Sequence, residues 1–107
     1  MTLKKQYLKS RPEVRVTFEV SKQAAHDAAK VYLLGEFNDW TPIELEHMKN
    51  GKFKTIVSLP TDKKPSYEFR YKLCSPDGDE MFENDWEADA YYPNAFGEDN
   101  SVVTVTH

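Results

Sequence analysis

The chain has little of what marks several common classes of protein. Cys74 is its single cysteine among 107 residues, so an internal disulfide is excluded, and this usage is typical of a reducing compartment. No apolar run approaches the roughly 18 residues that a membrane-spanning helix needs, and residues 1–10 lack the apolar region of a signal peptide. We therefore expect a cytoplasmic protein that has no membrane partner.

Basic residues are missing from the last third of the chain. Residues 1–72 hold all 14 Lys and Arg together with nine acids, and residues 73–107 hold the other nine acids, so these parts carry net charges of +5 and −9. Without a sustained basic stripe, no nucleic-acid partner is expected. Asp77, Asp79 and Glu80 offer oxygen ligands, but their spacing differs from that of a calcium-binding loop. The sequence therefore predicts a solvated acidic surface, no metal site and no cofactor.

Apolar and polar residues alternate with the period of two that indicates half-buried strands. Helix signals are limited to residues 21–29, which we interpret as a loop with a helical turn capped by Ser21. The pattern, together with turn signals such as Asn50-Gly51, predicts strands at residues 14–20, 31–34, 53–59, 67–73 and 101–106. Five strands at this spacing predict an antiparallel β-sandwich.

The length of the chain is that of a single domain. We expect residues 1–12 to form a loosely attached N-terminal arm that ends at Arg11-Pro12, and residues 13–107 to form the sandwich. The alternation also predicts core positions, namely Val14, Phe18, Leu33, Val57, Phe69, Tyr71, Val103 and Val105.

The segments between the strands combine aromatic rings with Asn and Asp. Three such segments are GEFNDW at residues 35–40, FENDW at 82–86 and YYPNAFGEDN at 91–100. The six Phe, six Tyr and two Trp supply more ring area than a core of this size must bury. Rings can pack on the C–H faces of a sugar, while Asn supplies both a donor and an acceptor for its hydroxyls. The segments therefore indicate a sugar-binding surface.

The ordered motifs resemble those of the family 48 carbohydrate-binding modules. VYLLGEFNDW is followed by GKFKTIVSLP, YEFRYKL, a DG turn and ENDWEADAYYPNAFGEDNSVVTV, so the resemblance covers about residues 14–106. This family includes the early-set domains N-terminal to isoamylases and branching enzymes and the glycogen-binding domain of the AMP-activated protein kinase β subunit. The chain is most similar to small free-standing bacterial members. The resemblance implies an immunoglobulin-like, early-set β-sandwich of about six to eight strands that binds α-1,4-glucan, the polymer of starch and glycogen.

The same resemblance implies a set of carbohydrate-binding residues. Trp40 matches a Trp that stacks on glucose, and Arg70 matches a Lys that bonds to hydroxyls. Phe82 matches a second stacking Trp, Phe96 an apolar residue that packs against the glucan ring, and Asn100 an Asn that bonds to hydroxyls.

The chain departs from the family pattern near the second stacking position. Phe82 offers a smaller plate than Trp, and the turn at residues 74–78 is about two residues longer than in compact relatives. Trp86 is therefore a rival for this platform. Structural roles remain as alternatives: a plug on the sandwich edge for Trp40, a buried anchor for Trp86, an ion pair for Arg70 and a turn cap for Asn100.

The sequence predicts a binding module and not an enzyme. A chain of this length cannot contain a barrel of about 250 residues, and none of its carboxylates is singled out as a catalytic pair. Cys74 has no evident base partner, and the three histidines have no ligand spacing. An alternative is a protein-interaction or regulatory module that binds no sugar and acts beside a glycan-processing enzyme such as a glycoside hydrolase or branching enzyme. The binding hypothesis requires Trp40, Arg70, Asn100 and one of Phe82 or Trp86 to converge on one exposed face.

Overall fold

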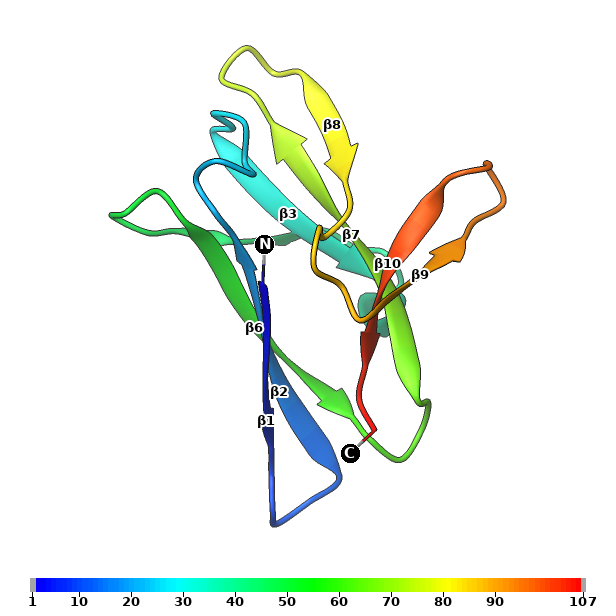
Figure 1. Cartoon of the computed structure of the whole chain (residues 1–107). Helices are drawn as coiled ribbons and strands as arrows, with labels where there is room; N and C mark the ends of the chain where they lie inside the picture. Colours follow the sequence, from blue (N-terminus) through cyan, green and yellow to red (C-terminus); the bar gives the residue numbers. More distant parts are fainter. Residues whose placement is uncertain (1, 107) are drawn as a thin grey trace.

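Two antiparallel β-sheets pack face to face in the computed structural model, which describes residues 2–106 (Figure 1). This architecture confirms the predicted all-β sandwich and is consistent with the immunoglobulin-like class. The described residues contain ten strands and no α-helix. The number of strands exceeds the expected six to eight because it includes two strands of only two residues each, β4 (Ile43–Glu44) and β5 (Glu46–His47). No helix within residues 2–106 is long and apolar enough to cross a membrane.

The first sheet has four strands in the order β1-β2-β6-β5. Its long strands are β2 (Glu13–Val20) and β6 (Phe53–Pro60), which pair along their full length. Gly51, at the turn before β6, has a φ of 89°, a conformation that glycine adopts without the strain of a side chain. Pro60 ends β6 because it has no N–H to donate to the ladder.

The second sheet has six strands, and its strands carry or adjoin the three segments that combine aromatic rings with Asn and Asp. Its path runs β4-β3-β7-β10-β9, and β8 pairs with β7 off that path. The remaining elements are β3 (Lys30–Gly35), the short 3-10 turn η1 (Glu36–Asn38), β7 (Ser66–Cys74), β8 (Glu80–Glu83), β9 (Ala90–Pro93) and β10 (Asp99–Thr104).

The core lies between the two sheets and is filled by the inward residues of each alternating strand. Phe18 from the first sheet meets Phe69 from the second edge-on, with ring centroids 5.1 Å apart. Phe69 in turn lies edge-on to Tyr71, whose side chain is fully buried. All the core residues predicted from the alternation are buried except Val57, which is partly buried against the same cluster.

Residues 2–7 were expected to belong to a loosely attached arm, and they instead form β1 (Thr2–Tyr7), an edge strand of the first sheet. Leu3 and Tyr7 pack partly buried against the core, which ties the strand down. The apolar pattern did not reveal this strand because the middle one of its three inward positions, between Leu3 and Tyr7, is Lys5. Met1 lies outside the described residues.

Lys5 links β1 to the other sheet through Asp89, in the loop before β9. The Lys5 Nζ lies 2.6 Å from Asp89 Oδ2, and that oxygen also accepts hydrogen bonds from the backbone N–H and hydroxyl of Thr104. Burial alone would raise the pKa of Asp89, but the hydrogen bonds and the positive charge of Lys5 outweigh it, so the pKa is lowered. The charged carboxylate therefore stabilises the closed edge of the sandwich.

We predict that Asp89→Ala lowers the free energy of unfolding by about 1 kcal/mol at pH 7, since the pair is partly solvated. A lowered folded-state pKa gives stability that is present above the ordinary Asp pKa of about 3.9 and is lost as pH falls through the folded value. Denaturant unfolding at pH 7 and pH 3 should show the difference between wild type and variant shrinking at the lower pH. A difference that is the same at both values would contradict this role.

Candidate functional site

In the second sheet, β8 and β10 diverge beside Arg70, whose side chain lies on the face directed away from the core. One edge of β7 pairs with β8 from Tyr71 to Cys74 and with β10 from Ser66 to Phe69. Arg70 lies between these paired stretches, where the two neighbouring strands diverge, as Figure 1 shows for β8 and the β9–β10 hairpin. Because β7 alternates, Arg70 projects to the outer face while its neighbours Phe69 and Tyr71 are buried in the core.

The turn after β3 presents Trp40 at the same face. Trp40 has a φ of 59° and Asp39 a φ of 55°, a left-handed conformation that bulky residues rarely adopt. Asn38 holds the turn, since its Oδ1 accepts from the N–H of Gly35 at 3.1 Å and its Nδ2 donates to the carbonyl of Thr41 at 2.7 Å. Gly35 is required because a Cβ there would lie 2.4 Å from the ring of Phe37. The Trp40 ring remains 38% exposed.

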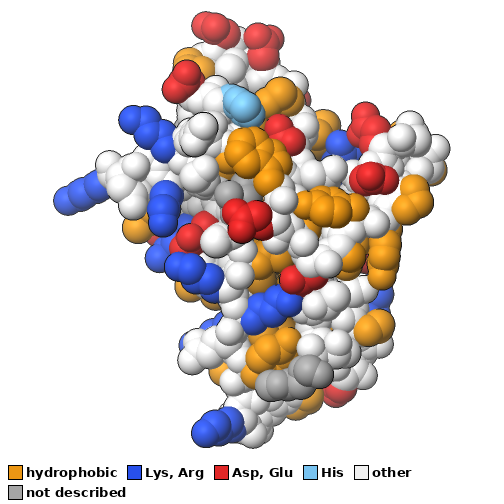
Figure 2. All heavy atoms as spheres, viewed as in Figure 1, with side chains coloured by type: hydrophobic (Ala, Val, Ile, Leu, Met, Phe, Trp, Pro, Cys, Tyr) orange, Lys and Arg blue, Asp and Glu red, His pale blue; other side chains and the backbone are white. Residues whose placement is uncertain are grey.

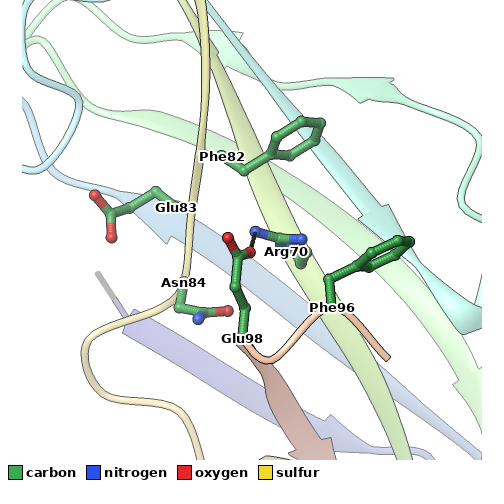
Figure 3. Close-up of a pocket in the computed structure, with 6 residues that line it drawn as sticks. All are labelled: Arg70, Phe82, Glu83, Asn84, Phe96 and Glu98. Atoms are coloured by element: carbon green, nitrogen blue, oxygen red, sulfur yellow. Dashed lines mark hydrogen bonds and ion pairs between the residues drawn. The ribbon is translucent and has the colours of Figure 1, made fainter. Parts of the chain in front are cut away.

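Arg70 is held in place by a ring and a carboxylate. Its guanidinium lies over the ring of Phe82, 4.9 Å from the centroid, and its Nη2 donates to Glu98 Oε2 at 2.9 Å. The Arg70 Nε is buried and has no partner. Figure 3 shows the guanidinium between the rings of Phe82 and Phe96, with Glu98 closing one side. The ion pair leaves this part of the site close to neutral.

The β9–β10 hairpin brings Phe96 to the site. Asn94 forms the turn, with Oδ1 accepting from the backbone N–H groups of Phe96 and Glu98. Asn100 lines the face but is only 7% exposed, and its amide is engaged on both sides: Oδ1 accepts from Asn94 and Nδ2 donates to Glu68, each at 3.2 Å. Asn100 therefore supports the hairpin through the side chains of Asn94 and Glu68.

These side chains border one shallow hollow of about 300 Å³ on the outer face of the second sheet. A second hollow of about 540 Å³ shares Arg70, Phe82 and Phe96 with the first. Five of the six predicted carbohydrate-binding residues line the smaller hollow, whose full lining is Leu34, Trp40, Arg70, Phe82, Asn94, Phe96 and Asn100. We call this surface the aromatic groove.

Trp86, the sixth predicted residue, lies apart from the aromatic groove. It follows β8 in a loop and packs edge-on against His26, with ring centroids 6.3 Å apart. Its side chain is 52% exposed, so it is no buried anchor. Of the two rivals for the second platform, Phe82 is the one that shares the groove with Trp40.

A buried polar network fixes the loop between β8 and β9. Asp85 is fully buried, accepts from the hydroxyl of Tyr71 at 3.4 Å and from the N–H of Glu87 at 2.8 Å, and donates its own N–H to Ser101 Oγ. Burial raises the pKa of the Asp85 carboxyl, partly offset by these hydrogen bonds. Burial likewise raises the pKa of Tyr71 well above its ordinary value. Asn84 joins the network because its Oδ1 accepts hydrogen bonds from the backbone N–H and the hydroxyl of Ser101.

Two residues of the aromatic groove, Leu34 and Asn94, were missed from the sequence, and so was Glu98, the partner of Arg70. Leu34 is an outward position of a buried strand, and period-two alternation could have identified it. Asn94 stands three residues before Gly97, whose φ is 79°, and this is a turn signal. Glu98 carries no local signal, because its role depends on Arg70, 28 positions away in the chain. Among residues 2–106, no group of three or more His, Cys, Asp or Glu is placed to hold a metal ion.

Comparison with known proteins gives no further assignment. No family model matches the chain, and a search of curated proteins returns no significant match.

We predict that Asn38→Ala lowers the free energy of unfolding by about 1–2 kcal/mol, because two hydrogen bonds of the turn are lost. The strained backbone at Trp40 should then relax, shifting and broadening the Trp40 indole N–H signal in an NMR spectrum. Asn50→Ala is the matched control, since Asn50 supports the distant turn at Lys52. An unshifted Trp40 signal in Asn38→Ala would show that Asn38 does not position the ring.

Proposed function

We propose that the protein is a non-catalytic binder of α-1,4-glucan and that the aromatic groove is its binding surface. The observation that carries this proposal is that Trp40, Arg70, Phe82 and Phe96, from four separate segments, border one hollow. Each of the three rings is more than one-third exposed, although burial of such rings is favourable.

The chemistry of the groove suits a neutral, hydroxyl-rich ligand. The rings offer flat apolar surfaces for the C–H faces of glucose. Glu98 accepts from Nη2 alone, so the guanidinium retains other N–H donors, and Asn94 borders the same hollow. An α-1,4-linked chain curves, whereas a β-1,4-linked chain is a flat ribbon. Rings that surround a hollow therefore favour the curved chain over the flat one.

The carboxylates beside the groove favour binding over hydrolysis. Glycoside hydrolysis uses two carboxyl groups about 5–9.5 Å apart across the scissile bond. Of the two that border the larger hollow, Glu98 is bonded to Arg70, and Glu83 points away from the rings (Figure 3). Each shallow stack contributes about 1 kcal/mol, so we expect a dissociation constant in the micromolar to millimolar range, strengthened on a polymer by repeated contacts. A glycan-processing enzyme acting on the same polymer remains a proposed partner.

We predict that Trp40→Ala weakens binding to β-cyclodextrin and maltoheptaose by about fivefold, because one stacking contact of about 1 kcal/mol is lost. Phe82→Ala should weaken it by a similar factor. The matched control is Trp86→Ala, which removes an exposed Trp outside the groove and should leave the dissociation constant unchanged. Isothermal titration calorimetry measures all three.

The proposal fails if wild-type protein at millimolar sugar gives no heat with either α-glucan. Unchanged binding in Trp40→Ala would place the sugar elsewhere. Loss of binding in Trp86→Ala, with wild-type binding in Phe82→Ala, would move the second platform to Trp86.

A further inference from the structure

Trp86 combines an exposed ring with a rigid backbone. The residues on either side are fixed: Asp85 is fully buried in its network, and the Glu87 N–H donates to Asp85 Oδ1. The Tyr91 hydroxyl donates to the carbonyl of Asp85 at 2.6 Å and accepts from the N–H of Ala88 at 3.3 Å. A large ring that is half exposed on a fixed support is typical of the central contact residues of protein interfaces.

His26 connects Trp86 to a small apolar hollow. Its ring meets Trp86 edge-on, and its Nε2 lies 3.8 Å from Glu83 Oε2. The backbone of His26 is left-handed, with a φ of 49°, and Asp27 follows at 61°, so two strained residues hold the ring at this position. The hollow has a volume of about 190 Å³, and its apolar lining is Ala25, Ala28, Leu73 and Met81.

This surface lies on the opposite side of β8 from the aromatic groove. Phe82 pairs with Lys72 and faces the groove, whereas its neighbour Met81 pairs with the buried Leu73 and borders the small hollow. The two apolar surfaces therefore lie on opposite faces of β8, because successive side chains of a strand point to opposite faces. We call the second one the Trp86 surface; it consists of Trp86, His26, Met81 and the small hollow.

The Trp86 surface is ringed by carboxylates. Asp79 and Glu80 border the small hollow, Glu83 faces His26, and Glu87 is the exposed neighbour of Trp86. Residues 73–107 contain no Lys or Arg. Lys72 pairs with Glu80 at 3.1 Å and Lys5 with Asp89, which leaves Glu83 and Glu87 without a Lys or Arg partner in the described structure. Figure 2 shows acidic side chains at the top of this view, and most of the visible basic ones lie along the left and lower parts of the molecule, where acidic ones are also present.

We propose that the Trp86 surface docks an arginine-bearing segment of a protein partner. The guanidinium would stack on the face of Trp86, as arginine does on exposed Trp rings, with the carboxylates of Glu83 and Glu87 supplying opposite charge. An apolar side chain beside that arginine fits the small hollow. The charge of the surface favours this occupant over a second sugar, since the carboxylates of Glu83 and Glu87 attract a cation and a neutral sugar lacks that attraction. The proposal does not depend on glucan binding.

The probe is the peptide acetyl-Arg-Leu-Arg-amide, and its matched control replaces both arginines by citrulline, which has nearly the same shape and no charge. The two Trp indole N–H signals in an NMR spectrum, assigned with Trp86→Phe, report the two surfaces separately. We expect the arginine peptide to shift the Trp86 indole and the amides of residues 25–28 at millimolar concentration and to leave the Trp40 indole in place. The citrulline peptide should cause less than one-third of the shift.

Charge variants distinguish a specific site from general attraction to an acidic protein. Glu83→Gln with Glu87→Gln should weaken arginine-peptide binding at least threefold. Glu44→Gln with Glu46→Gln removes the same charge from β4 and β5 and should change it much less. The proposal is overturned if the citrulline peptide binds equally, if both double variants weaken binding alike, or if maltoheptaose shifts the Trp86 indole in the same way as the Trp40 indole.

Discussion

The alternation of side chains along β7 is the constraint on which both the core and the aromatic groove depend. Its inward residues Phe69 and Tyr71 are fully buried, while Arg70 between them carries the ring of Phe82 and the carboxylate of Glu98 on the other face. A shift of register by one residue would exchange the two sets and destroy both surfaces at once. Because β7 also pairs with β3, β8 and β10, it fixes where each of their outward side chains stands.

Polar side chains hold each of the loops that carry exposed rings. Asn38 closes the turn of Trp40, Asn94 closes that of Phe96, and Asp85 anchors the loop of Trp86. Each of these side chains bonds mainly to backbone groups, so the rings can stay exposed without loss of order. The abundance of Asn and Asp beside rings in the sequence is thus partly a requirement of the loops themselves.

The long strands that have one buried face could be predicted from the sequence. Features that depend on residues far away in the chain could not. The alternation located β2, β6 and β7 closely because half of each strand is buried. It missed β1 because Lys5 occupies an inward position, where Asp89 compensates for its charge. It also missed β8 and β9, four-residue strands whose side chains are largely exposed and which exist through pairing with β7 and β10. Asn100 lines the groove, and its role toward a ligand stays a prediction; no local pattern could have predicted that its amide bonds to Glu68 and Asn94.

The central claim is that rings from separate segments of the chain form one α-glucan surface on the outer face of the second sheet. An amide and indole NMR titration of the labelled protein with maltoheptaose, using cellohexaose as the control, tests it most directly. The account predicts shifts at the Trp40 indole and at the amides around Arg70, Phe82 and Phe96, caused by the α-glucan alone. No shift at millimolar maltoheptaose, or equal shifts with cellohexaose, would contradict it.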